Sequence, residues 1–133
     1  MSDNWETPEH ILEPLKEEFG DFFDPCPLNA KFNGLEIEWG DPVFINPPYS
    51  RKLKKQFIEE AYNRWKKDNK TIVMLLPVST SSKTFHEFIL PHCEIRFVKG
   101  RIKFKGYNNN GDLIKDKDAM HDSMICIFHK RTE

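Results

Sequence analysis

The sequence predicts a single α/β domain with a mostly parallel sheet and helices on its faces. Short apolar runs of strand length occur at 43–45 and 71–76, and segments with helical spacing of apolar residues lie at 7–20 and 52–67. Strands that alternate with helices are typical of parallel sheets. The 133 residues suffice for one core, so we expect 1–133 to form one domain without a separate recognition domain.

The N-terminal third is expected to form a helix and two short strands. Thr7 is the predicted N-cap and Pro8 the first helical residue, and Gly20 ends the helix. A short strand at 22–23 is expected to end at Asp24, and a second at 35–39. The residues between Asp24 and the strand at 43–45 are too few for two strand–helix units, so the predicted sheet is truncated.

The rest of the chain is expected to continue the same alternation. Residues 43–45 form a buried strand, 52–67 a helix, and 71–76 the clearest buried strand, which Pro77 ends. Beyond it we expect a short helix at 83–89, strands at 94–98, 102–104 and 124–128, and a polar loop at 105–122.

Composition and charge narrow the classes of function. With 20 Lys and Arg against 21 Asp and Glu, any nucleic-acid contact must come from a local patch. No apolar run is long enough to span a membrane, so no membrane partner is expected. Three cysteines without paired spacing indicate reduced thiols in a cytosolic setting. The five histidines and the cysteines form no ligand signature, so no metal site is predicted.

The most informative segment is Asn46-Pro47-Pro48-Tyr49, directly after the strand at 43–45. Two prolines hold the backbone stiff, so an amide and an aromatic ring are fixed at the end of a buried strand. The Asn46 oxygen and a proline carbonyl can accept hydrogen bonds from an amino group, while the Tyr49 ring stacks on a base. The alternative is a rigid turn in which Asn46 caps a helix. The strand–turn–helix context favours a site for an amine-bearing base.

Further blocks extend this motif into a resemblance. In order they are Trp5-Glu6-Thr7-Pro8, Phe23-Asp24-Pro25, Gly34-Leu35 with Trp39, the segment 44–50, Leu75-Leu76-Pro77 and Gly100-Arg101-Ile102-Lys103-Phe104. The ordered set resembles the phage-type DNA N6-adenine methyltransferase (Dam) family. The resemblance implies a truncated Rossmann-like methyltransferase sheet and methyl transfer from S-adenosylmethionine to adenine N6 in DNA. It also implies a phage or prophage origin and a place in the bacterial cytoplasm.

The resemblance assigns roles to individual residues. Asn46, Pro47, Pro48 and Tyr49 are the implied catalytic residues. The implied cofactor-binding residues are Trp5, Thr7, Pro8, Asp24 and Pro25, together with Asn46. Asp24 would meet the amino group of the methionine moiety, and its alternative role is that of a turn residue before Pro25. For Thr7 and Trp5 the alternative is an ordinary helix cap beside a core tryptophan. Glu36 and Glu38 are weaker candidates for the cofactor ribose.

Candidate DNA contacts lie in three places. Ser50, Arg51, Lys52, Lys54 and Lys55 follow the Asn46 motif and are candidates for phosphate binding, although a solvated helix face explains them equally well. Arg101 and Lys103 alternate with apolar neighbours, which leaves fold support and DNA contact both open. Tyr107 and the loop 105–122 are candidates for reading bases, the alternative being a solvated hairpin.

Two other functions remain open at this point. An amino-methyltransferase acting on RNA or on protein glutamine would use the same Asn46 pocket. A non-catalytic module that binds nucleic acid or cofactor on a degenerate fold would explain the short span between Asp24 and residue 43. The sequence leaves the DNA recognition sequence and the oligomeric state open.

Overall fold

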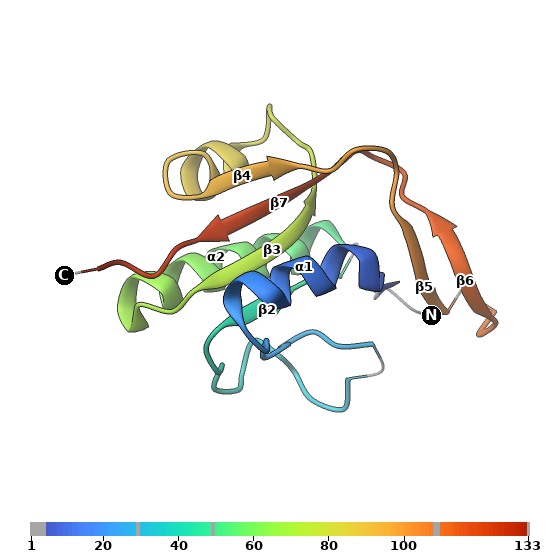
Figure 1. The fold of residues 1–133 in the computed structure, drawn as a ribbon, viewed down its shortest axis with the longest axis horizontal. Helices are drawn as coiled ribbons and strands as arrows, with labels where there is room; N and C mark the ends of the chain where they lie inside the picture. The colour runs from blue at the N-terminus through green and yellow to red at the C-terminus, as the bar shows by residue number, and fades with distance from the viewer. Residues whose placement is uncertain (1–4, 29, 49, 108–109, 133) are drawn as a thin grey trace.

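The computed structural model describes residues 5–28, 30–48, 50–107 and 110–132. Within these ranges the chain forms two sheets, two α-helices and one π-helix (Figure 1). In chain order the elements are β1 (Trp5–Glu6), α1 (Glu9–Phe19), β2 (Val43–Ile45), α2 (Arg51–Asp68), β3 (Ile72–Pro77), the π-helix η1 (Phe85–Ile89), β4 (Glu94–Phe97), β5 (Lys103–Tyr107), β6 (Leu113–Asp118) and β7 (Ser123–Phe128).

The larger sheet has the strand order β2-β3-β7-β4. β2 and β3 are parallel, with Val43 opposite Ile72 and Ile45 opposite Met74. β7 is antiparallel to both of its neighbours, so β2, β3 and β4 run in one direction and β7 in the other. Phe23 adds a single parallel bridge to Val43 at the outer edge of β2. The polypeptide before Asp24 therefore runs alongside the strand that leads to Asn46.

The smaller sheet is antiparallel and has the strand order β1-β5-β6. Trp5 lies opposite Gly106, and the register between β5 and β6 shifts between Phe104 and Gly106. Figure 1 shows β5 and β6 as a hairpin at one end of the molecule, with the C-terminus at the opposite end. The short strand β1 ties the N-terminal segment to this hairpin.

The prediction of a mostly parallel, Rossmann-like sheet is wrong. The larger sheet is mixed and the smaller one is antiparallel. Parallel neighbours need a long crossover connection, and α2 supplies one between β2 and β3. A short connection joins β5 and β6, as is usual for antiparallel neighbours, and the chain returns to the larger sheet through β7, which runs antiparallel between β3 and β4. Helices do cover both faces of the larger sheet, but the strand directions differ from the prediction.

Three element predictions also need correction. Residues 35–39 form no strand, and residues 105–122 form most of the β5–β6 hairpin and not a loop. Helix α1 begins at Glu9, with Pro8 in the N-cap position and no side-chain cap, so the prediction that Thr7 caps it is wrong. Thr7 is instead buried.

The core lies on both faces of the larger sheet because neighbouring side chains of a strand point to opposite sides. Val43, Ile45, Ile72 and Met74 pack on one face. Helix α2 and η1 cover this face through Phe57, Ile58, Ala61, Phe85 and Ile89. Phe44, Val73, Leu75 and Ile127 pack on the other face, against Leu15 of α1 and Trp5, Ile102, Phe104 and Ala119. Both faces are buried, so the central strands carry continuous apolar runs.

The connection from residue 26 to residue 42 is held against α2 by polar contacts. Arg64 of α2 donates to the Ile37 carbonyl at 2.6 Å and to the Leu35 carbonyl at 3.2 Å. Its guanidinium also lies over the Trp39 ring, 4.2 Å from the centroid. Trp39 donates from Nε1 to the Gly34 carbonyl at 2.7 Å. These contacts fix an irregular segment that has few backbone partners of its own.

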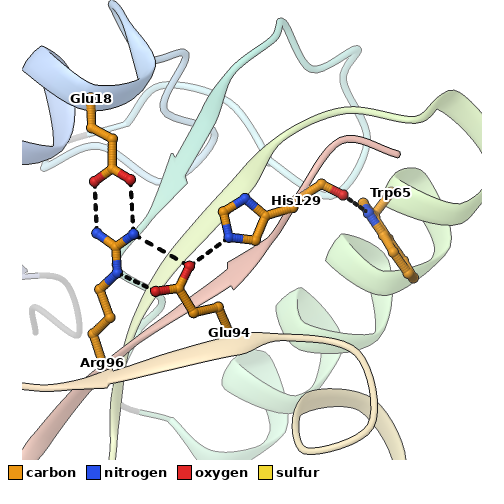
Figure 2. Close-up of polar contacts among 5 residues, drawn as sticks. All are labelled: Glu18, Trp65, Glu94, Arg96 and His129. Atoms are coloured by element: carbon orange, nitrogen blue, oxygen red, sulfur yellow. Dashed lines mark hydrogen bonds and ion pairs between the residues drawn. The ribbon is translucent and has the colours of Figure 1, made fainter. Parts of the chain in front are cut away.

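A polar network joins α1, β4 and the segment after β7 (Figure 2). Arg96 of β4 donates to both carboxylate oxygens of Glu18 in α1, at 2.7 and 2.8 Å. Its Nε lies 2.6 Å from Glu94, whose other oxygen lies 2.6 Å from Nε2 of His129. The His129 carbonyl accepts from Nε1 of Trp65 in α2 at 2.7 Å. The network therefore links elements on both sides of the larger sheet.

Candidate active site

Asn46 is the first residue after β2, and it is buried, with a relative exposure of 9%. Its Nδ2 donates to the backbone carbonyl of Trp5 in β1. This bond fixes the orientation of the amide, because the nitrogen faces β1 and the oxygen faces the other way. Within the described part of the chain, no donor is recorded for Oδ1. The Asn46 oxygen is thus an oriented acceptor at the end of a core strand.

A cavity of about 160 Å³ opens beside Asn46. Asn46 and Pro47 form one wall, and Leu75, Leu76 and Pro77 at the end of β3 form another. The hairpin and the turn after it close the cavity through Phe104 and residues 119–121. This volume lies below the usual range for drug-sized ligands and is on the scale of one planar base. We call it the Asn46 pocket.

The predicted motif residues lie in different places around this pocket. Pro47 lines it, as does the Asn46 side chain, whereas Pro48 is buried and does not line it. Tyr49 lies outside the described residues, so its predicted stacking role stays a prediction. Met120 lines the pocket with a side chain that is 69% exposed, which places an apolar group at its mouth.

A second cavity of about 520 Å³ adjoins the first and shares Lys54, Leu76, Pro77 and His121 with it. Arg51 and Lys55 of α2 add two further cations to its wall. Across from them, the segment between β3 and η1 contributes Ser79, Ser82 and Thr84. We call this second cavity the basic groove.

Asp24 lies one residue beyond the Phe23–Val43 bridge, and Asn46 lies three residues beyond it. The Asp24 carboxylate accepts from the Cys26 amide at 2.8 Å, the geometry of a turn residue before a proline. Asp24 nevertheless keeps an exposed surface. Burial of its carboxyl among protein atoms raises its pKa to about 6, and the bond from Cys26 opposes this shift. Asp24 lines neither of the two cavities described above.

The other predicted cofactor residues lie close to Asn46 or are part of the core. Trp5 and Thr7 are both buried, and Trp5 packs with Phe44 and Phe104. The Pro8 carbonyl accepts from the amides of residues 11 and 12, which opens α1. Pro25 is fully buried. The structure therefore brings Trp5 into contact with Asn46. Pro8 contributes its carbonyl to the first turn of α1, and Pro25 is part of the buried interior.

Some of the predicted DNA-contacting residues line the basic groove and others do not. Arg51, Lys54 and Lys55 line the basic groove, but Lys52 lines neither cavity. Ser50 is the N-cap of α2 and accepts from the Leu53 amide at 3.3 Å. Tyr107 is half-buried in β5, opposite Leu113.

Arg101 and Lys103 contact the polypeptide itself. Arg101 donates to the Ala119 and Met120 carbonyls at 3.4 and 3.2 Å, and Lys103 lies 2.6 Å from Asp118. Ile102 and Phe104 are buried, so the predicted alternation along this segment is confirmed. The described contacts of Arg101 hold the turn that carries Met120.

Neither metal ligation nor thiol chemistry is supported by the described residues. No group of three His, Cys, Asp or Glu side chains among them is placed to hold a metal ion. The three cysteines are free thiols, and burial raises the pKa of Cys126 to about 12 and that of Cys93 also well upward. These two thiols are therefore protonated near neutral pH. No helix in the described ranges is long and apolar enough to cross a membrane.

Sequence reasoning missed the residues that complete the two cavities. These are Ser79, Ser82, Thr84, Met120 and His121. A signal was present for the first three, because a run of serine and threonine follows the most apolar strand of the chain. Ligands bind beyond the carboxyl ends of such strands. The same reasoning that selected Asn46 after β2 therefore applies to residues 79–84 after β3.

Comparison with known proteins shows the family of the chain. The family model described as DNA N-6-adenine-methyltransferase (Dam) matches residues 1–133. A DNA N-6-adenine-methyltransferase of Haemophilus phage HP1 (strain HP1c1) is 30% identical over 143 residues, covering 97% of this chain and 80% of the phage protein. No solved structure matches the chain. The match over the full chain and the phage relative show that this protein belongs to the DNA N-6-adenine-methyltransferase (Dam) family.

Proposed function

We propose that this DNA adenine methyltransferase takes its methyl group from S-adenosylmethionine and holds the target adenine in the Asn46 pocket. The observation that carries the proposal is the Asn46 amide, whose nitrogen is bound to the Trp5 carbonyl and whose oxygen is left as an acceptor. The target of the reaction is an exocyclic amino group, and such a group donates hydrogen bonds. An oriented acceptor in a base-sized pocket is the matching chemistry.

The residues near Asp24 fit the cationic end of S-adenosylmethionine. The carboxyl of Asp24 is accessible and partly desolvated, so it attracts an ammonium group more strongly than a fully hydrated carboxylate would. Asp24 and Asn46 follow neighbouring parallel segments, which supports a cofactor and a base at the same edge of the sheet. When bound, S-adenosylmethionine supplies an electrophilic methyl group on a sulfonium.

The role of the protein in the reaction is mainly to orient the amine. The adenine amino nitrogen is a weak nucleophile because its lone pair is delocalised into the ring. Hydrogen bonds from that NH₂ to Asn46 Oδ1 and to the Pro47 carbonyl favour a pyramidal nitrogen with its lone pair directed at the methyl group. Phe104 and Leu75 belong to the core on the face of the larger sheet that α1 covers. Both also line the pocket, so the floor of the pocket excludes water. The base must leave the duplex to reach this position.

Two substitutions at one position test the role of Asn46. Asn46→Ala removes the acceptor and also the bond to Trp5, and we expect methyl transfer to fall at least about 100-fold, as for loss of one oriented polar group. Asn46→Asp keeps an oxygen acceptor, but its second oxygen faces the Trp5 carbonyl and can replace the Nδ2 donor only when the carboxyl is protonated, so this variant should regain activity over the alanine variant as the pH is lowered. N6-methyladenine released from treated DNA is measured by mass spectrometry, and cofactor binding by calorimetry.

The cofactor measurement separates the possible results. We expect both variants to bind S-adenosylmethionine within about threefold of the wild type, because Asn46 faces the amine. Equal inactivity of the two variants at low pH, where the introduced carboxyl is protonated, would refute the acceptor role of residue 46. A folded alanine variant that loses cofactor binding but transfers methyl groups at high cofactor concentration would move Asn46 to the cofactor site. A methylated product in RNA or in protein glutamine, with none in DNA, would refute the substrate assignment.

A further inference from the structure

The basic groove has a lining that differs from the composition of the whole chain. The protein carries 21 acidic and 20 basic residues. The lining of the groove nevertheless contains Arg51, Lys54 and Lys55 and no carboxylate. Such a local excess of positive charge attracts a phosphate group despite the neutral balance of the chain. Arg51 and Lys55 form no ion pair within the described ranges, so their charge is available to a ligand.

The opposite wall of the groove is polar but uncharged, and its floor is apolar. Ser79, Ser82 and Thr84 form the wall, and Phe85, Ile89 and Met124 contribute to the floor. A ligand that fits has an anionic group, an apolar planar face and polar edges. A nucleotide has all three. The volume of about 520 Å³ is several times that of the Asn46 pocket and falls within the range of pockets that hold whole small molecules.

The wall between β3 and η1 is rigid before any ligand binds. Ser82 Oγ donates to the Ser79 carbonyl at 3.1 Å and accepts from the Phe85 amide at 3.2 Å. His86 Nε2 lies 2.6 Å from the Thr80 carbonyl, and the Val78 amide donates to the Asp122 carbonyl at 2.8 Å. The segment then enters a π-helix, a geometry frequent at functional sites. The wall is therefore preformed.

We propose that the basic groove is a subsite for the nucleotide next to the target adenine in the DNA strand. The inference rests on the proposed function, because the adenine is placed in the Asn46 pocket. The two cavities adjoin and share Lys54, Leu76, Pro77 and His121. A base in one cavity and the neighbouring nucleotide in the other can therefore be joined by the sugar-phosphate backbone of the DNA strand. Arg51, Lys54 and Lys55 bind the phosphates, and the bases stack above the floor near Phe85.

In this subsite the hydroxyl of Thr84 reads the edge of the neighbouring base. Thr84 is half-buried and occupies the N-cap position of η1, but its side chain makes no capping hydrogen bond. Ser82, in contrast, already binds the backbone on both sides. Among the described residues, Thr84 and Ser79 are thus the wall hydroxyls with hydrogen bonds left to offer, and Thr84 is the more buried of the two. The groove gives this domain a means of reading the base next to the target adenine.

The test uses a pool of duplexes that carry one adenine flanked by randomised bases. The pool is methylated with S-adenosylmethionine, and the modified sites are identified by sequencing. We expect the wild type to prefer a particular base at one adjacent position. Thr84→Val keeps the shape of the side chain and removes its hydroxyl, so it should reduce that preference about threefold to tenfold, the contribution of one hydrogen bond. Preferences at other positions should not change.

A matched pair of lysine variants tests the phosphate contact. Lys55 lines the groove and Lys52, on the same helix, lines neither cavity. Lys55→Gln should weaken binding of DNA about fivefold and lower the salt dependence of binding by roughly one phosphate contact. Lys52→Gln should change affinity less than twofold. Equal effects of the two substitutions would refute the phosphate contact.

The outcomes for the groove and for the proposed function are distinct. Wild-type protein that methylates no duplex in the pool would refute the proposed function itself. Wild-type protein that methylates duplexes without preference at an adjacent base would refute only the subsite. A Thr84→Val variant with the wild-type preference, or with an equal loss of rate on every sequence, would show that Thr84 does not read the neighbouring base.

Discussion

Gly34 is the position at which a single methyl group should disturb the cofactor side of the site. A Cβ atom at Gly34 would lie 1.8 Å from the carbonyl oxygen of Pro25 and 2.8 Å from its carbonyl carbon. It would also lie 3.3 Å from Cε1 of Phe57 in α2. To restore ordinary contact, the two segments would have to separate by about 1.5 Å. The obstacle is backbone, so a change of rotamer cannot relieve it.

The cost of Gly34→Ala follows from this geometry. Forcing extra atoms into a packed site costs about 1–3 kcal/mol, and the short contact with backbone places this variant near 3 kcal/mol. For a chain of this size, that corresponds to a melting temperature lower by about 10 °C. The Gly34 segment cannot easily move away, because Trp39 donates to the Gly34 carbonyl and Arg64 holds the carbonyls of residues 35 and 37.

The displacement should reach the cofactor site through Asp24, the residue before Pro25. We therefore expect S-adenosylmethionine binding to weaken at least about tenfold, since errors of about 1 Å in placement are costly. Calorimetry measures the affinity, and thermal unfolding followed by circular dichroism measures the stability. Gly20→Ala is the control: Gly20 has no neighbour within 4 Å, but its φ of 101° with ψ of -173° is a conformation that essentially only glycine adopts, so this variant loses about 1–3 kcal/mol through backbone strain without a steric push towards Asp24. A Gly34→Ala protein that binds S-adenosylmethionine as tightly as the Gly20→Ala protein would refute the reasoning.

Two further predictions concern pH. Because the pKa of Asp24 is raised to about 6, its carboxylate becomes protonated as the pH falls below 6, and S-adenosylmethionine affinity measured by calorimetry should fall about tenfold between pH 7.5 and 5. Asp24→Asn should bind weakly with a flat pH profile, and a wild-type profile that is equally flat would contradict the role of Asp24. The bonds from Arg96 and His129 lower the pKa of Glu94 from 4.5 to about 2, so the stability that Glu94 contributes is complete above pH 4.5 and is lost as the pH falls towards 2. Arg96→Met should therefore destabilise the protein by about 1 kcal/mol at pH 7 and by little at pH 2.5, as measured by urea unfolding, and an equal loss at both pH values would show that packing and not charge is responsible.

The central strands and the second helix are predictable from sequence because burial leaves a simple pattern. β2 and β3 are apolar at successive positions, since both faces of the larger sheet are covered. α2 shows its buried residues Phe57, Ile58 and Ala61 at helical spacing. The direction of a strand leaves no such pattern, so the antiparallel placement of β7 was not predictable from its apolar run.

The β5–β6 hairpin was mistaken for a loop because its second strand is highly polar. β6 reads Leu-Ile-Lys-Asp-Lys-Asp, and Lys and Asp are disfavoured in strands. β6 pairs with β5, the strand before it, and β5 in turn pairs on its other side with β1, which is distant in sequence. The side chains of Ile102 and Phe104 anchor the hairpin in the core on the face of the larger sheet that α1 covers. Such long-range pairing outweighs local propensity and is invisible in a short window of sequence.

The position of Asn46 at the end of a buried strand was predictable from sequence, because it needs only an apolar run followed by a stiff turn. The Asn46 motif forms only one wall of its pocket, and other segments of the chain form the remaining walls. The contacts of Arg101 hold one of those segments in place. Arg101 binds the carbonyls of Ala119 and Met120, and residues 119–121 close the Asn46 pocket from the hairpin side. The N-terminal segment reaches the same hairpin through the pairing of Trp5 with Gly106, and it reaches Asn46 through the Trp5 carbonyl. Trp5, Asn46 and Arg101 are far apart in sequence, and each holds a different wall of one pocket. Their contacts bring sequence blocks that are far apart in the chain to one pocket.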